Sequence, residues 1–205
     1  MAKNEIPALT LAEEQRMFAI EHSMAIIVFA ELEEQLCNFV AYQVGKASGA
    51  AMKTAMYGIE SFRAKLEFAD RLTRGYLEGK SGMVERWDGV LSAVAKANTR
   101  RNKLVHQSRR VFPKSEPGLR VVLIRVVDDA PTTRPAPADA IGVRKLVESR
   151  FLASQARNQL GGLWGLLKNG RDVFEDVAPL KPPKLHDMVA EYRRSTLANL
   201  VKTEA

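Results

Sequence analysis

Apolar residues recur every three or four positions between Met17 and Val40, and this spacing constrains the fold more than any other feature of the chain. In an α-helix, residues at such intervals share one face. The stripe consists of Met17, Ile20, Met24, Ile27, Val28, Leu32, Leu36, Phe39 and Val40. Just before it, Thr10 and Glu13 have the spacing of a capping box, in which hydroxyl and carboxylate satisfy free backbone amides. The sequence therefore predicts a long helix from Thr10 to near Gly45.

Four more segments have helical patterns. We expect helices over residues 49–57, over 61–77, from Ser81 towards His106, and from Asp139, as the N-cap, to about Lys168. The stripe of the fourth helix is formed by Val84, Trp87, Leu91 and Val94. These segments predict a fold in which helices pack against one another around a common core.

One segment departs from the helical period. A turn with two prolines and a glycine, residues 113–118, precedes a run rich in β-branched residues, 119–127. This order predicts a two-stranded β-hairpin. The expected fold class is all-α: an up-and-down bundle of about five helices with a small β-hairpin insertion near residues 109–128. We assign residues 1–169 to the bundle and 170–205 to a C-terminal extension with one further helix.

The composition excludes several kinds of site and location. A single cysteine, Cys37, permits neither an intrachain disulfide nor a thiolate-based zinc site, and three widely spaced histidines do not form a ligand cluster. We therefore expect no metal and no cofactor. Residues 1–20 lack the pattern of a secretory signal, and the most apolar run, 24–30, is shorter than the about 20 residues that span a bilayer. The sequence predicts a cytoplasmic protein without membrane association.

Two asparagines interrupt the stripe of the fourth helix. On a helical wheel the stripe continues through Asn98, Asn102 and Val105, where apolar residues are expected. Arg101 and His106 border it on opposite sides, about 140° apart and about 7.5 Å along the axis. A buried amide without a partner costs about 1–3 kcal/mol, so these positions need an explanation. A hydrogen-bonded polar core, a helix end emerging into water, and a ligand-binding cleft each provide one.

Positive charge gathers on the same segment. The whole chain has 31 Lys and Arg against 24 Asp and Glu, a formal net charge of +7. Between residues 96 and 110 there are six basic residues and no acid: Lys96, Arg100, Arg101, Lys103, Arg109 and Arg110. Such a cluster suits a phosphate backbone. We therefore name Lys96, Asn98, Arg100, Lys103, Arg109 and Arg110 as candidate RNA- or phosphate-binding residues.

The sequence Arg101-Asn-Lys-Leu-Val-His106 resembles the R-polar-x-x-x-H signature of the HEPN superfamily. The setting is similar as well, because the motif lies late in a long helix and follows a G-x-x-x-F/K-L type helix, here Gly58 to Leu66. The resemblance covers residues 10–168, and its specific part is six residues. HEPN proteins are typically small helical bundles that dimerise and bring two copies of the motif together.

The resemblance implies an activity and a role for each motif residue. Many members of the superfamily are metal-independent endoribonucleases that cleave single-stranded RNA. His106 would be the acid–base group, Arg101 would stabilise charge on the phosphate, and Asn102 would orient or hydrogen-bond them. Because Arg101 and His106 diverge within one chain, two chains facing each other could supply converging groups, which makes a homodimer a mechanistic expectation.

Two alternatives remain. Other HEPN proteins have no catalysis and serve as RNA-binding or protein-interaction modules, with an antitoxin or another protein as partner. In HEPN toxins paired with nucleotidyltransferase antitoxins, a tyrosine often lies two residues after the histidine, whereas this chain has Ser108. The second alternative is a helical scaffold in which Asn98 and Asn102 pair within the core.

Overall fold

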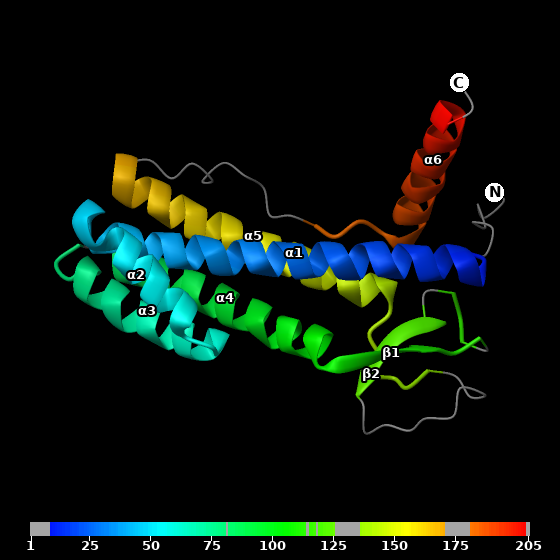
Figure 1. The fold of residues 1–205 in the computed structure, drawn as a ribbon, viewed down its shortest axis with the longest axis horizontal. Coiled ribbons are helices and arrows are strands. Elements are labelled where there is room, and N and C mark those ends of the chain that lie inside the picture. Colours follow the sequence, from blue (N-terminus) through cyan, green and yellow to red (C-terminus); the bar gives the residue numbers. More distant parts are fainter. Residues whose placement is uncertain are drawn as a thin grey trace. The chain divides into compact units, whose positions relative to one another are not determined.

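The computed structural model describes residues 9–80, 82–113, 115–117, 119–125, 136–170 and 181–203. Its elements, in chain order, are α1 (Leu11–Gln43), α2 (Lys46–Gly58), α3 (Phe62–Leu77), α4 (Met83–Val105), β1 (Gln107–Val111), β2 (Val121–Arg125), α5 (Val143–Asn169) and α6 (Leu185–Thr203) (Figure 1). The predicted fold class, an all-α bundle with a small β-hairpin insertion, is confirmed. Within this part of the chain, no helix is both long enough and apolar enough to span a bilayer.

Local signals in the sequence begin and end several of these helices as expected. At the start of α1, the Thr10 amide donates to Glu13 Oε2 at 2.8 Å and the Glu13 amide donates to Thr10 Oγ1 at 3.2 Å, which confirms the capping box. Ser61 caps α3 by accepting a hydrogen bond from the Ala64 amide. After α3, Gly79 adopts a φ of 76°, a left-handed conformation that favours glycine.

The predicted N-cap of the fifth helix is wrong. Asp139 is exposed and α5 begins at Val143. The residues between them are used differently, because Ile141 and Leu123 of β2 exchange two backbone hydrogen bonds of 3.0 Å. This bridge holds the chain extended before α5, so the helix starts later than the spacing predicts.

The chain divides into two compact units. The first comprises the described parts of Met1–Met24, Leu104–Glu148 and Lys181–Ala205. In it β1 and β2 pair antiparallel, with Ser108 opposite Ile124 and Arg110 opposite Val122. A small core under this hairpin consists of Phe112, Val122, Ile124 and Ala140.

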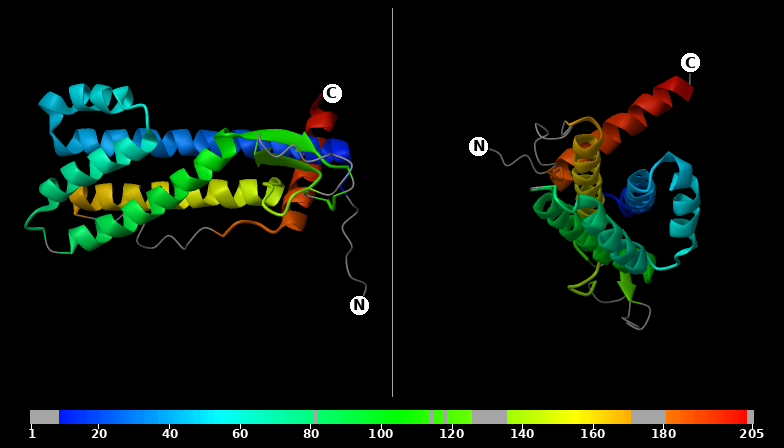
Figure 2. Two further views of the ribbon diagram at one scale, coloured as in Figure 1. Left: turned by 90° about the horizontal axis from the view of Figure 1, so that it is seen from below. Right: turned by 90° about the vertical axis from the view of Figure 1, so that its left-hand side faces the viewer.

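The second unit, Ala25–Lys103 with Ser149–Leu180, is helical in its described part. Its core includes Phe39 and Trp87, whose rings stack with centroids 5.6 Å apart. The buried Trp87 indole donates to Asp70 at 2.8 Å, so its polar nitrogen is satisfied. Figures 1 and 2 show α2 turning back alongside the C-terminal half of α1.

Candidate functional site

The buried face of α4 decides where its polar residues lie. It is formed by Trp87, Val90, Val94, Ala97 and Leu104. The predicted stripe instead passes through Val84 and Leu91, and both of these are only half-buried. Asn102 lies about 100° from the centre of the buried face and is exposed. The prediction that Asn102 occupies the buried stripe is therefore wrong, because the stripe is rotated towards Val90 and Ala97.

The three motif residues differ in exposure. Arg101 lies in line with the buried face and is half-buried, in the last turns of α4. Asn102 is exposed beside it, and His106 is exposed as the first residue after the helix ends at Val105. Asn102 and His106 are thus open to a ligand from solvent, whereas Arg101 is partly covered.

Asn98 does lie where the sequence predicts a polar interruption. Its side chain is half-buried, and Oδ1 is buried without a hydrogen-bond partner. An unsatisfied carbonyl of this kind costs about 1–3 kcal/mol. The second alternative from the sequence, a helical scaffold in which Asn98 and Asn102 pair within the core, is wrong because Asn102 is exposed and Asn98 Oδ1 is unpartnered.

Exposed cations flank the motif on both sides. Lys96, Arg100 and Lys103 are exposed on α4, and Arg109 and Arg110 are exposed on β1. In the described part of the chain, none of the five forms an ion pair with a carboxylate. Their charge is therefore available to an external anion.

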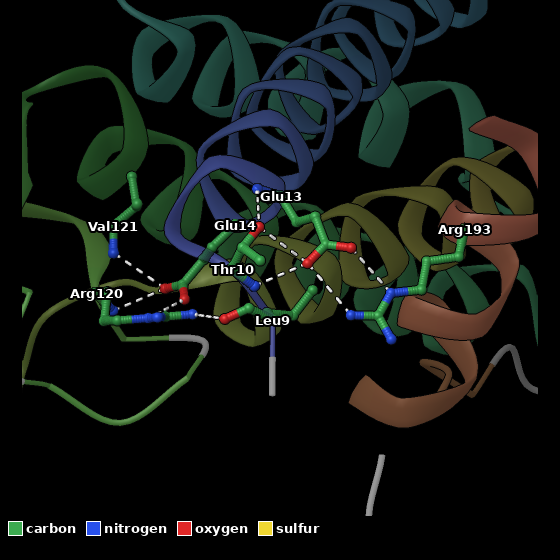
Figure 3. Close-up of polar contacts among 7 residues, drawn as sticks. All are labelled: Leu9, Thr10, Glu13, Glu14, Arg120, Val121 and Arg193. Carbon is green, nitrogen blue, oxygen red and sulfur yellow. Dashed lines mark hydrogen bonds and ion pairs between the residues drawn. The ribbon is translucent and has the colours of Figure 1, made fainter. Parts of the chain in front are cut away.

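The strand that follows His106 is held in place by a buried carboxylate. Glu14 of α1 is fully buried and accepts hydrogen bonds from the amides of Arg120 and Val121 at 2.7 and 3.0 Å (Figure 3). The Arg120 Nε also donates to Glu14 at 2.9 Å, and its Nη2 donates to the Leu9 carbonyl. These bonds satisfy the buried charge and attach β2, and through it β1, to the start of α1.

A second carboxylate joins α1 to α6. Glu13, the capping-box residue, accepts from Arg193 of α6 at 2.9 and 3.2 Å (Figure 3). The Arg193 hydrogen bond is the main cause that lowers the pKa of Glu13 from 4.5 to about 2, followed by the hydrogen bond from the Thr10 backbone. The first turn of α1 therefore holds both the hairpin and the last helix.

Sequence reasoning identified the cap but missed the Glu14–Arg120 pair. One signal was present: Glu14 lies three residues before Met17, on the extension of the apolar stripe, where a charge must find a buried partner. Arg120 is 106 residues away in the sequence, so no local pattern names it as that partner.

The remaining candidates for chemistry are structural in character. Cys37 is buried, and burial raises the pKa of its thiol, which makes it unreactive. His22 stacks on Phe18 with ring centroids 6.1 Å apart, and the exposed His186 pairs with Asp187 at 2.8 Å. Among the described residues, no group of three His, Cys, Asp or Glu side chains could hold a metal ion.

Comparisons with protein families, with curated proteins and with solved structures find no match to this chain.

Proposed function

We propose that this protein is an endoribonuclease that cleaves single-stranded cytoplasmic RNA without a metal, at a site to which two copies of the chain contribute. The observation that supports the proposal is the placement of Arg101 and His106 among exposed cations that have no carboxylate partner among the residues that the structure describes. Unpaired cations of this density are an electrostatic footprint for a phosphate backbone. The resemblance of residues 101–106 to the HEPN signature supports the same assignment.

The proposed chemistry needs only groups that the chain provides. His106 takes the proton of a ribose 2′-hydroxyl, and the 2′-oxygen forms a bond to the adjacent phosphorus. The bond from phosphorus to the 5′-oxygen then breaks, and the leaving oxygen receives the proton that the same imidazolium returns through a water molecule. The products are a 2′,3′-cyclic phosphate and a 5′-hydroxyl.

Arg101 would stabilise the charge that develops on the non-bridging oxygens. Its planar guanidinium can donate two parallel hydrogen bonds to such a group. Asn102 would orient the imidazole or the substrate. Asn98 has a buried carbonyl oxygen without a partner, which could accept a hydrogen bond from a ribose hydroxyl or a base.

The direct test is replacement of the proposed base. We expect His106→Ala to lower the rate of single-stranded RNA cleavage at least about 100-fold while the fold is retained. The matched control is His186→Ala, which removes an exposed histidine outside the motif and should leave the rate unchanged. Cleavage is followed on a labelled oligonucleotide in the presence of EDTA. Full activity of His106→Ala, or loss of wild-type activity on adding EDTA, would overturn the proposal.

A second candidate function is a non-catalytic module that binds RNA or a protein such as an antitoxin. The exposure of Arg109 and Arg110 on β1 favours it specifically, because these cations can bind phosphates without any proton transfer. In this case binding would occur without turnover.

The salt dependence of RNA affinity measures how much Arg109 and Arg110 contribute to binding, whether the protein is a nuclease or a binding module. We expect the Arg109→Ala/Arg110→Ala double variant to bind RNA more weakly and to lower the slope of log affinity against log salt by about 2. Arg144→Ala is the control, since Arg144 is exposed but already paired with Glu148 at 3.1 Å. An unchanged slope in the double variant would mean that β1 does not contact the phosphates.

A further inference from the structure

Three large apolar side chains are exposed on one face of α1. Ile20, Met24 and Ile27 have 50%, 39% and 50% of their surface open to solvent. They are spaced by four and three residues on a continuous helix, so helix geometry alone places them on one stripe. We call these three residues the α1 stripe. Single exposed apolar residues are normal on a protein surface, but a contiguous set marks an interaction site.

The C-terminal continuation of the same face is covered within the second unit. Positions seven apart stay aligned to within about 20° per heptad, so Glu34 and Ala41 continue the line of Ile20 and Ile27. Glu34 pairs with Lys53 of α2 at 3.5 Å. At Gly49 of α2, an added Cβ would lie 3.2 Å from the Ala41 carbonyl oxygen, so the two helices touch there. A helix thus already packs on this face from Glu34 onwards.

The stripe is arranged symmetrically about its own centre. Around the midpoint between Ser23 and Met24, Ile20 mirrors Ile27 and Arg16 mirrors Glu31. When two copies of one helix pack antiparallel about a two-fold axis at this midpoint, Ile20 meets Ile27 of the partner subunit, and Arg16 meets Glu31 of the partner subunit. The surface is therefore complementary to itself in shape and in charge.

The charges on α1 favour antiparallel packing of the two α1 helices over parallel packing. Arg16 and Glu31 are both exposed. Glu31 bonds Arg157 through Oε2, which leaves Oε1 to accept from a second guanidinium. Parallel packing would set Arg16 against its own copy, and like charges in contact disfavour association.

We propose that a second copy of this chain docks on the α1 stripe, with the two α1 helices antiparallel and centred between Ser23 and Met24. This inference rests on the proposed function only in the expectation that two copies associate. The choice of face and the direction of packing follow from the α1 residues.

Charge exchange tests the direction of packing. Alone, Arg16→Glu and Glu31→Arg each place two like-charged pairs in the interface, and we expect the dimer dissociation constant to rise at least about tenfold in each. Mixed together, the two variants restore both pairs, so a heterodimer should form. Arg157→Ala is the matched control for Glu31→Arg, because it breaks the same intrachain pair and should leave the dimer intact. Analytical ultracentrifugation measures the dimer dissociation constant of the two charge variants, of their mixture and of the control.

Cross-linking tests the centre of the interface. The native Cys37 is buried, so Met24→Cys adds one exposed thiol, and we expect it to form a disulfide-linked dimer on mild oxidation. The control is Gln15→Cys, which is exposed but lies about 140° around the helix from Ile20 and should stay unlinked. Circular dichroism checks that each variant is folded.

The outcomes separate this inference from the proposed function. A monomeric wild-type protein, a dimer unaffected by Ile20→Glu and Ile27→Glu, or a mixture of charge variants that forms no heterodimer would each overturn the α1 interface. A wild-type dimer that shows these effects but cleaves no RNA supports the interface and overturns the nuclease.

Discussion

Glu13 illustrates how one residue combines a local and a distant role. Its side chain closes the capping box with Thr10 and also accepts two hydrogen bonds from Arg193 of α6. Each of these interactions favours the ionised carboxylate, and together they lower its pKa from 4.5 to about 2. A carboxyl with a depressed pKa in the folded state stabilises the protein only while it is ionised.

The pH dependence of stability follows from this shift. Because the folded-state pKa is below the unfolded value, the stabilisation by Glu13 is fully present above about pH 5 and is lost as the pH falls towards 2. We expect Glu13→Gln to be less stable than wild type at pH 7, and the difference to shrink between pH 5 and about 2. Urea unfolding at several pH values measures this difference, with Glu148→Gln as control, because Glu148 is half-exposed and pairs with the neighbouring Arg144. A difference that stays constant over that range would contradict the assignment.

At the residue scale, the sequence correctly predicts the cap of α1 but wrongly predicts that Asn102 lies on the buried face of α4. The Thr10 and Glu13 spacing predicts the observed cap, because a capping box involves only four consecutive residues. Asn102 was misplaced because two half-buried residues, Val84 and Leu91, shift the apparent stripe away from the buried face. Only packing against other elements fixes which side of an amphipathic helix is covered.

At the scale of elements, the hairpin depends on one buried ion pair. Glu14 is fully buried and accepts hydrogen bonds from the backbone amides of Arg120 and Val121 and from the Arg120 guanidinium. The Leu123–Ile141 bridge holds β2 on its other edge. His106 directly precedes β1, so the position of the proposed base depends on the same anchoring.

Replacing the buried carboxylate tests this dependence. We expect Glu14→Gln to lower the free energy of unfolding by about 3 kcal/mol, since it leaves Arg120 without its counter-charge in a buried setting. Amide exchange in β1 should increase more than in α3. The control is Glu67→Gln, which breaks an exposed pair with Arg63 worth about 0.5 kcal/mol or less. Equal losses in the two variants would show that the hairpin is held by other contacts.

The elements themselves were largely predictable. Helical periodicity, together with glycine and serine at the helix ends, predicts α1 to α4 nearly as observed. The β-branched residues predict a strand over 119–127, and β2 lies within that range. β1 begins at Gln107, two residues before the predicted insertion, because Gln107 pairs with Arg125. The late start of α5 was not predictable, since the Leu123–Ile141 bridge joins residues far apart in the chain.

At the scale of the whole molecule, the proposals describe an assembly of two chains. On an ideal helix Arg101 and His106 are about 140° apart, so one chain presents them in different directions. In the proposed function a two-fold partner supplies the complementary group to each, and the α1 stripe is the surface on which we propose that the second copy docks. The pattern of one chain does not specify which groups converge across a dimer, and mixed dimers test it directly.

The most direct measurement is RNA cleavage by an equimolar mixture of the Arg101→Ala and His106→Ala variants. Each variant alone lacks one group in both shared sites and should be inactive. In a randomly reassociated mixture, half of the dimers contain one complete site of two, so about one quarter of wild-type activity is expected. If the mixture remains as inactive as its components while the heterodimer forms, the two chains do not share the site and the account is wrong.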